Sequence, residues 1–169
     1  MNQSTKEGQI KELETQMLKE PGKIGLPSGT LNPKYVFFAQ NPGEKLIPGT
    51  RVFTDPKCKG SSAILLPILE EFGILKDSFF DNVVKNTTPH NRVPSTKDIQ
   101  RWTPYIIREL QILGFYENTE IKVIALGNFA DTILSNLRIN HIKISHPMRT
   151  CYNYSVDEYK QEIKMSLDL

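Results

Sequence analysis

The stretch Tyr35-Val-Phe-Phe-Ala-Gln-Asn-Pro-Gly-Glu44 begins with bulky apolar residues and ends abruptly in a polar turn. An apolar run of this kind is typical of a strand that is buried on both faces, and Asn-Pro-Gly then takes the backbone out of the sheet. Open α/β sheets bind ligands beyond the carboxyl ends of their strands. Because Pro42 fixes its own φ and Gly43 tolerates unusual backbone conformations, the turn can hold Asn41 rigidly toward a ligand. We therefore predict that this turn is one half of an active site, although such turns also end strands that have no catalytic role.

Strand and helix patterns alternate along the rest of the chain. Alternation of this kind predicts one α/β domain over residues 1–169, a three-layer α/β/α sandwich around a central four-stranded parallel sheet. The segments 23–33 and 44–60 are rich in Gly and Pro and are predicted to be loops. Beyond the first strand, the predicted strands are 79–85, 121–126 and 142–145. The predicted helices are 5–19, capped by Ser4 or Thr5, then 61–72, 95–113, 129–137 and 156–167.

Composition limits the classes of function. The 169 residues carry a formal net charge of +2, which excludes neither a nucleic acid nor a small molecule as partner. A DNA contact would therefore be a local patch. Cys58 and Cys151 lie far apart without a Cys-x-x-Cys pair, so we expect neither a disulfide framework nor a metal site. With no apolar leader and no run near the ~18 residues of a membrane span, we expect an intracellular protein without membrane contact, acting as a monomer.

Four polar or aromatic positions outside the first turn are candidates for function. Asn82 lies in the predicted second strand, where an unpartnered amide would cost about 1–3 kcal/mol, so it either holds a loop or presents its amide to a base or sugar. Phe53 is either a core anchor or a stacking platform. Gly127-Asn128 opens a helix directly after a strand, and its first amides would suit a DNA phosphate. His146 follows the last strand and could reach the same pocket as Asn41.

These residues resemble the uracil-DNA glycosylase superfamily. Gln40-Asn-Pro-Gly43 resembles its first motif, and His146-Pro147 resembles the start of its second motif, His-Pro-Ser. A further similarity is to the signature of the thermostable iron–sulfur branch, called family four. It is carried by Asn82-Val-Val-Lys85, Pro89, Asn91-Arg92, Pro94, and Leu126-Gly127 with Ala130. The resemblance runs from the first helix to about Arg149.

The sequence also departs from that branch. Asn86 and Trp102 stand where two of its four cluster cysteines would be, and the N-terminal segment has no cysteine pair, so we expect neither an iron–sulfur cluster nor another cofactor. Asn-Pro-Gly in the first motif is nearer to the mismatch-specific and single-strand-selective branches. Met148 replaces the Ser of the second motif. The resemblance therefore implies a mixed branch.

The resemblance implies a DNA repair enzyme, a monofunctional uracil-DNA glycosylase that flips a base out of DNA and hydrolyses its N-glycosidic bond. Phe53 would stack on the base, and Asn82 would bind its Watson–Crick edge. His146 would donate to the charge that develops on uracil O2, helped by amides near Gln40. Asn41 would orient the water.

Substrate range and DNA contacts follow from the same resemblance. Gly43 stands where other branches have an aromatic residue that excludes the methyl group of thymine, so thymine in a G·T mispair is a candidate substrate. Another damaged base, such as hypoxanthine, is the alternative if uracil is not released. Met148 is either a wedge in the DNA stack or a core residue. The predicted DNA contacts are Lys85, Arg92, Gly127, Asn128, Met148 and Arg149.

One element of the family's chemistry is missing, because the amide of Asn41 cannot accept a proton from water. Glu44, Asp55 and Asp81 are candidates for the absent carboxylate, with Glu44 the first to consider. The alternative function is a catalytically weak or inactive DNA-binding homologue of the same fold. A generic nucleotide-binding domain is disfavoured, since the sequence has no Gly-x-Gly-x-x-Gly or Gly-Lys-Ser/Thr loop.

Overall fold

The centre of the fold is a five-stranded, mostly parallel sheet, seen in a computed structural model that describes residues 5–57 and 60–169. The strand order is β1-β3-β2-β4-β5, and the strands are β1 (Ser28–Gly29), β2 (Tyr35–Ala39), β3 (Ser78–Asn82), β4 (Lys122–Leu126) and β5 (Ile142–Ile144). Strands β2 to β5 are parallel, as predicted. The predicted count of four strands was wrong, because β1 adds an antiparallel edge strand to β3.

The extra strand lies in a segment that its composition predicts to be a loop. It has only two residues, and its pairing with β3 requires that one of them, Gly29, has no side chain. Its φ is +98°, and a Cβ there would lie 2.2 Å from the carbonyl oxygen of Ser78. Glycine therefore allows the close pairing that forms this edge, although glycine is depleted in strands generally.

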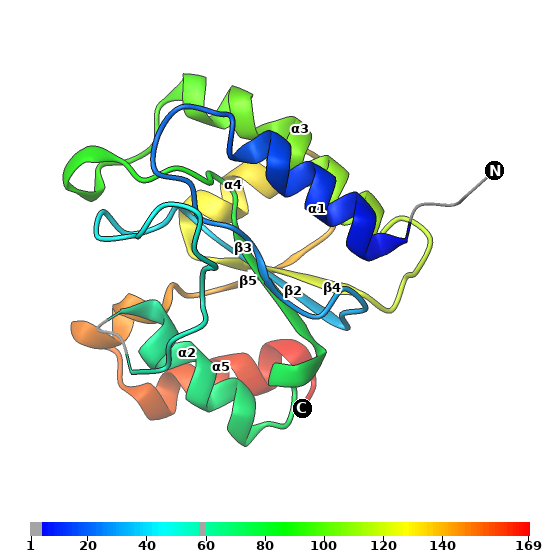
Figure 1. Cartoon of the computed structure of the whole chain (residues 1–169). Coiled ribbons are helices and arrows are strands. Elements are labelled where there is room, and N and C mark those ends of the chain that lie inside the picture. Colours follow the sequence, from blue (N-terminus) through cyan, green and yellow to red (C-terminus); the bar gives the residue numbers. More distant parts are fainter. Residues whose placement is uncertain (1–4, 58–59) are drawn as a thin grey trace.

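Helices cover both faces of the sheet (Figure 1). The helices are α1 (Lys6–Met17), α2 (Ser61–Glu71), α3 (Thr96–Leu113), α4 (Asn128–Asn136) and α5 (Val156–Leu167), with 3-10 turns at Leu75–Asp77, Pro89–Asn91 and Pro147–Cys151. Helices α3 and α4 pack on one face, and α2 and α5 pack on the other. Helix α1 packs on α3. The three-layer α/β/α arrangement is therefore confirmed.

Strand β2 is buried on both faces. Val36 and Phe38 pack into the α3–α4 side, whereas Phe37 and Ala39 pack into the α2–α5 side. All four are nearly inaccessible to solvent. This alternation explains why the strand carries a continuous apolar run instead of a polar–apolar pattern.

Several predicted boundaries shift by a few residues. Strand β3 ends at Asn82, short of the predicted residue 85, and α4 begins one residue early, at Asn128. Thr5 caps α1 by accepting the Gly8 N–H, and the other predicted cap, Ser4, lies outside the described residues. Helix α2 follows Gly60 without a side-chain cap.

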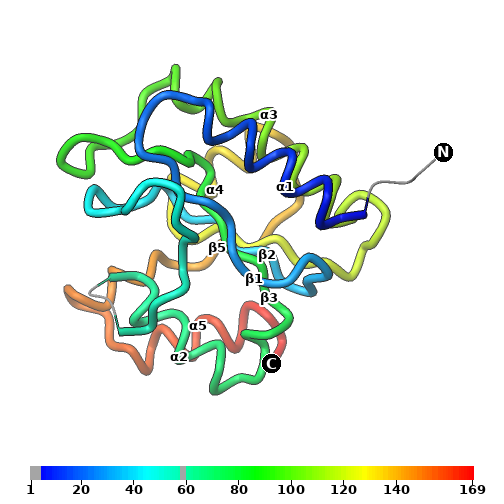
Figure 2. The backbone as a smooth tube through the Cα atoms, in the orientation of Figure 1, coloured from blue at the N-terminus to red at the C-terminus, as the bar shows by residue number. Residues whose placement is uncertain are grey.

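The topology creates a crevice at the carboxyl ends of β2 and β4. The connection after β2 runs through α2 on one face, whereas the connection after β4 runs through α4 on the other face. Neighbouring strands whose connections leave in opposite directions mark the usual ligand site of open α/β sheets. The loops after β2, β3 and β5 gather at this same end of the molecule (Figure 2).

No helix in the described residues is both long enough and apolar enough to cross a membrane.

Candidate active site

A cavity of about 380 Å³ opens at this crevice. It brings together four residues that sequence analysis predicted for the site, from the ends of three strands. Its lining consists of Gln40, Val93, Leu126, Gly127, Asn128, Phe129, Thr132 and His146. The cavity therefore joins the first motif, the start of α4 and the second motif.

His146 is held in one tautomer. Its Nδ1 accepts a hydrogen bond from the backbone N–H of Met148 at 3.2 Å, so a neutral ring carries its proton on Nε2. Burial lowers the pKa of His146 below its ordinary value, which favours the neutral form. The side chain can therefore act as a neutral hydrogen-bond donor through Nε2 near neutral pH.

Gly127 allows His146 to approach the start of α4. Its φ is +89°, and a Cβ at this position would lie 3.0 Å from the Cβ of His146. Its N–H donates to the carbonyl of Ile144 at 2.8 Å, which ties the end of β4 to the end of β5. Helix α4 has no side-chain cap, so its first amides can face a ligand in the cavity.

The Asn41 turn is tied to the loop that follows β3. Asn41 accepts from Gln40 Nε2 at 3.0 Å, and its Nδ2 donates to Pro42 O at 3.1 Å and Thr88 Oγ1 at 3.3 Å. Asn91 Oδ1 accepts the N–H of the residue after the turn, Glu44, at 2.9 Å. Sequence reasoning missed Thr88 as part of the site, since a threonine in a polar loop gives no signal of its own.

Asn82 and Phe53 lie on the α2–α5 side of the same sheet edge. Asn82 pairs in register with Ala39 and is 3% exposed. Phe53 stacks on Phe80, with ring centroids 5.6 Å apart, and residues 80 and 82 share one face of β3. Phe53 therefore packs as an aromatic anchor beside the core. Its role as a stacking platform stays a prediction, because neither it nor Asn82 lines the cavity described above.

Beneath Asn82 lies a buried triad of charged side chains, Asp81, Lys85 and Glu109, each with no exposed side-chain area. Lys85 Nζ lies 2.5 Å from Asp81 Oδ2 and 2.7 Å from Glu109 Oε2, and Asp81 Oδ1 accepts the backbone N–H of Asn82 at 2.6 Å. Burial raises the pKa of Glu109 well above its ordinary value, and the neighbouring Asp81 adds to this. Burial would lower the pKa of Lys85, but the two carboxylates outweigh it and raise that pKa.

The triad corrects two expectations. Lys85 cannot contact DNA, since its ammonium group is buried between two carboxylates. Asp81 points into the protein interior and cannot supply the missing catalytic carboxylate. Glu44 and Asp55 are exposed, and neither is among the described residues that line the cavity.

The side chains predicted to contact DNA differ in their exposure and in the contacts they already make. Arg92 is exposed in the loop after β3. Arg149 is exposed too, but its guanidinium group lies 4.3 Å from the centre of the Tyr154 ring and its Nη1 donates to Ser145 Oγ at 2.8 Å. Met148 is half-buried.

The positions that match cluster cysteines of the iron–sulfur branch cannot bind iron in this chain. Trp102 Nε1 donates to Asn86 Oδ1 at 2.6 Å, and both side chains are buried. Among the described residues there is no group of three or more His, Cys, Asp or Glu side chains that could hold a metal ion. Cys58 lies outside those residues, and Cys151 is free and exposed.

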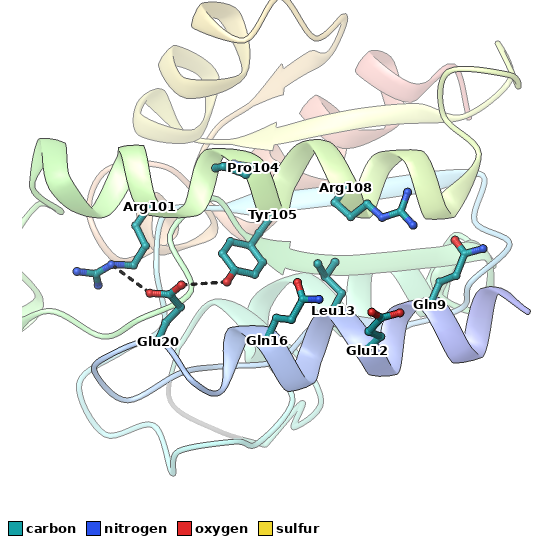
Figure 3. Close-up of a pocket in the computed structure, with 9 residues that line it drawn as sticks. All are labelled: Gln9, Glu12, Leu13, Gln16, Glu20, Arg101, Pro104, Tyr105 and Arg108. Carbon is teal, nitrogen blue, oxygen red and sulfur yellow. Dashed lines mark hydrogen bonds and ion pairs between the residues drawn. The ribbon is translucent and has the colours of Figure 1, made fainter. Parts of the chain in front are cut away.

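A larger cavity, of about 600 Å³, lies between α1 and α3 (Figure 3). Glu20 bridges its two sides, accepting from Tyr105 at 3.0 Å and lying 3.7 Å from Arg101. Because these groups satisfy one another and none belongs to a strand end, we do not assign the site to this groove.

Fold and site define an open α/β protein with a cavity where the strands end, lined by a histidine beside a helix that begins after a glycine. The family model of the uracil DNA glycosylase superfamily matches residues 26–168, and the chain belongs to this superfamily. No curated protein matches the sequence, so the comparison gives the family and not the branch.

Proposed function

We propose that the protein removes uracil from DNA by hydrolysing the N-glycosidic bond, as a monofunctional glycosylase acting as a monomer. The observation that carries this proposal is the geometry of His146. Its Nδ1 is occupied by the Met148 N–H, which leaves Nε2–H as a donor beside the cavity. Superfamily membership supports DNA as the partner.

In the proposed reaction, the base is first flipped out of the duplex, which costs a few kcal/mol and costs least at a mispair. The glycosidic bond then breaks, and uracil leaves as an anion whose charge develops on O2. His146 Nε2–H donates to this oxygen. A prearranged donor in a site shielded from water stabilises such charge more than a donor in solution can.

The attacking water is assigned to Asn41. Its Oδ1 already accepts from Gln40, and its Nδ2 donates within the loop, so the amide is fixed and offers one remaining lone pair to a water. Water adds to C1′ of the sugar, and because an amide cannot take its proton, the proton passes to the uracil anion or to solvent. Nor can an amide stabilise a cationic sugar as a carboxylate would. We therefore expect slower turnover than in relatives that have Asp at this position.

Base recognition is assigned to Asn82 and Phe53. The backbone N–H of Asn82 is bound by Asp81, and within the described residues no hydrogen bond is formed by its side-chain amide. An amide offers both a donor and an acceptor, the pair of groups that the Watson–Crick edge of a base can bind. Phe53 has a φ of +51°, a strained conformation for a non-glycine residue, and such strain is often found at binding sites.

Gly43 affects whether thymine can be a substrate. A Cβ at Gly43 would meet nothing within 4 Å, so space is open beside the turn. We infer that thymine in a G·T mispair is a second substrate. Cleavage of G·U and G·T duplexes by the same preparation tests this, and an absence of G·T cleavage at enzyme excess would refute it.

The decisive experiment is a gel assay with labelled oligonucleotides that carry uracil in a single strand, opposite G and opposite A. Alkali then cuts the abasic sites. Wild type should give product, Asn82→Ala should not, and Asn136→Ala, an exposed asparagine at the end of α4, should behave as wild type.

A second candidate is a DNA-binding homologue without catalysis. It is favoured by one observation: no carboxylate lines the cavity among the described residues. Binding to uracil-containing or abasic DNA without base release, at enzyme excess, would select this candidate.

A further inference from the structure

The loop that carries His146 is fastened to the last helix by one carboxylate. Ser145, the residue before His146, donates its backbone N–H to Glu162 Oε1 at 2.7 Å. The hydroxyl of Tyr154 donates to the other oxygen, Glu162 Oε2, also at 2.7 Å. Glu162 lies on α5 and belongs to neither sequence motif, so nothing in the sequence marks it as part of the site.

Arg149 links the two residues that donate to Glu162, because it contacts both Ser145 and Tyr154. Its Nη1 donates to Ser145 Oγ at 2.8 Å, and its guanidinium group stacks over the ring of Tyr154. Burial and the hydrogen bond to Glu162 raise the pKa of Tyr154 to about 12, so the hydroxyl keeps its proton and remains a donor. We name Ser145, Arg149, Tyr154 and Glu162 the α5 network.

The sheet alone does not hold this loop. Strand β5 has three residues and pairs only with β4, and the last registered pair is Leu126 with Ile144. Ser145 lies one residue beyond that pair, and Glu162 is the partner of its N–H. The Glu162 side chain therefore takes the place of a neighbouring strand as the hydrogen-bond partner of Ser145. Ser145 in turn sets the direction of His146.

We propose that Glu162 is a positioning residue for His146, which it holds through the backbone of Ser145. This rests on the proposed function, in which His146 donates to the departing base. The contrasting view is that Glu162 only docks α5 onto the fold. The two views differ in what happens to the imidazole of His146 when the carboxylate is removed.

The variants separate positioning from docking. Glu162→Ala removes both acceptor oxygens. Glu162→Gln keeps an oxygen for Ser145 and offers an N–H to the Tyr154 oxygen. Tyr154→Phe keeps the Ser145 contact and loses only the hydroxyl, which contacts Glu162 Oε2 at 2.7 Å and Glu158 O at 3.4 Å. Lys122→Ala is the matched control, because Lys122 Nζ donates to Leu167 O at 2.8 Å and fastens α5 at its other end.

Single-turnover base release should fall about 10- to 100-fold in Glu162→Ala, with DNA affinity nearly unchanged, since a small misplacement of a reacting group has that effect on the chemical step. Glu162→Gln should recover most of the rate, and Tyr154→Phe should lose less than Glu162→Ala. Adding Glu162→Ala to His146→Ala should cost nothing further, because a residue that acts through His146 has no effect without it. Equal losses in Glu162→Ala and Lys122→Ala would overturn the proposal.

Nitrogen NMR of the imidazole, without DNA, gives a readout that does not depend on activity. The His146 ring should show the Nε2–H tautomer in wild type, Glu162→Gln and Lys122→Ala, and averaged tautomers in Glu162→Ala. Unchanged signals in Glu162→Ala would refute positioning. If wild type released no base from any substrate, the proposed function would fail, while the NMR comparison would still decide whether Glu162 sets the histidine.

Discussion

Asn82 ends β3 and His146 lies two residues beyond the end of β5, yet the two residues are held by opposite kinds of chemistry. Under Asn82 lies the buried triad, three charged side chains with no exposed area. Beside His146 lies the α5 network, whose Arg149 is exposed and whose other three residues are half-buried. The buried triad is part of the core, whereas the α5 network lies at the surface.

The buried triad and the α5 network should therefore affect different properties: the triad affects the stability of the fold, and the network affects the geometry of the site. Buried charges that lose a partner destabilise a protein strongly, because the remaining charge has no water around it. Half-exposed hydrogen bonds contribute only about 1 kcal/mol each, since water replaces them. We therefore expect damage to the triad to appear as unfolding, and damage to the α5 network to appear as lost activity in a folded protein.

The largest expected effect comes from breaking the triad at its cation. Lys85→Met leaves two buried carboxylates without a counter-ion and should lower the free energy of unfolding by about 3–5 kcal/mol. Urea denaturation measures this. Lys34→Met is the control, since the ammonium of Lys34 is 3.6 Å from Asp77 and its side chain is 71% exposed, so a change within about 1 kcal/mol is expected. Similar stabilities for both variants would contradict the contrast drawn above.

The next effect is at the contact between α4 and His146. Gly127→Ala puts a Cβ 3.0 Å from that of His146 at a φ of +89° and a ψ of 175°, a conformation essentially limited to glycine, and should cost about 1–3 kcal/mol of stability through the backbone alone. Because the histidine must also shift, base release should fall further than stability predicts. Thermal melting and single-turnover rates measure the two effects. Gly60→Ala, where a Cβ meets nothing within 4 Å, should leave base release near wild type and cost at most about 1 kcal/mol of stability, through the poorer N-cap of α2.

A smaller effect is expected from pH. The pKa of His146 is lowered by burial, so the neutral ring persists to a more acidic pH than an exposed histidine with a pKa of about 6.5 would allow. Protonation of Nδ1 would break its bond to the Met148 N–H, so the acidic limb of kcat/KM should have its midpoint below about 6.5. A midpoint above that value would show that the limb does not report His146.

The smallest effect should come from a substitution of Arg92, which belongs neither to the buried triad nor to the α5 network. Arg92→Ala should weaken duplex binding and reduce the dependence of log affinity on log salt by about one, as for the loss of one phosphate contact. Fluorescence anisotropy at several salt concentrations measures this. Arg108→Ala, on the exposed side of α3 beside the groove of Figure 3, serves as control. An unchanged slope in Arg92→Ala would remove this residue from the DNA interface.

Local sequence predicted what depends on local pattern. The apolar run of β2, the four parallel strands and the three layers followed from periodicity, and strand ends pointed to Asn41, Gly127 and His146. The pairing of Lys85 with Glu109 was not predictable, because Glu109 is far from it in sequence and carboxylates are normally expected at the surface. Glu162 was missed for a similar reason, since its contact with Ser145 exists only once α5 packs against β5.

The short strand β1 has a consequence for how copies of the chain meet. Exposed strand edges invite pairing with other chains, and proteins blunt them with short or irregular edge strands. Here one edge ends in a two-residue strand held close by Gly29, and the other ends in three-residue β5. Neither offers a long template for a second sheet, so the topology itself limits aggregation, and a larger residue at position 29 would open the longer β3 to its neighbours.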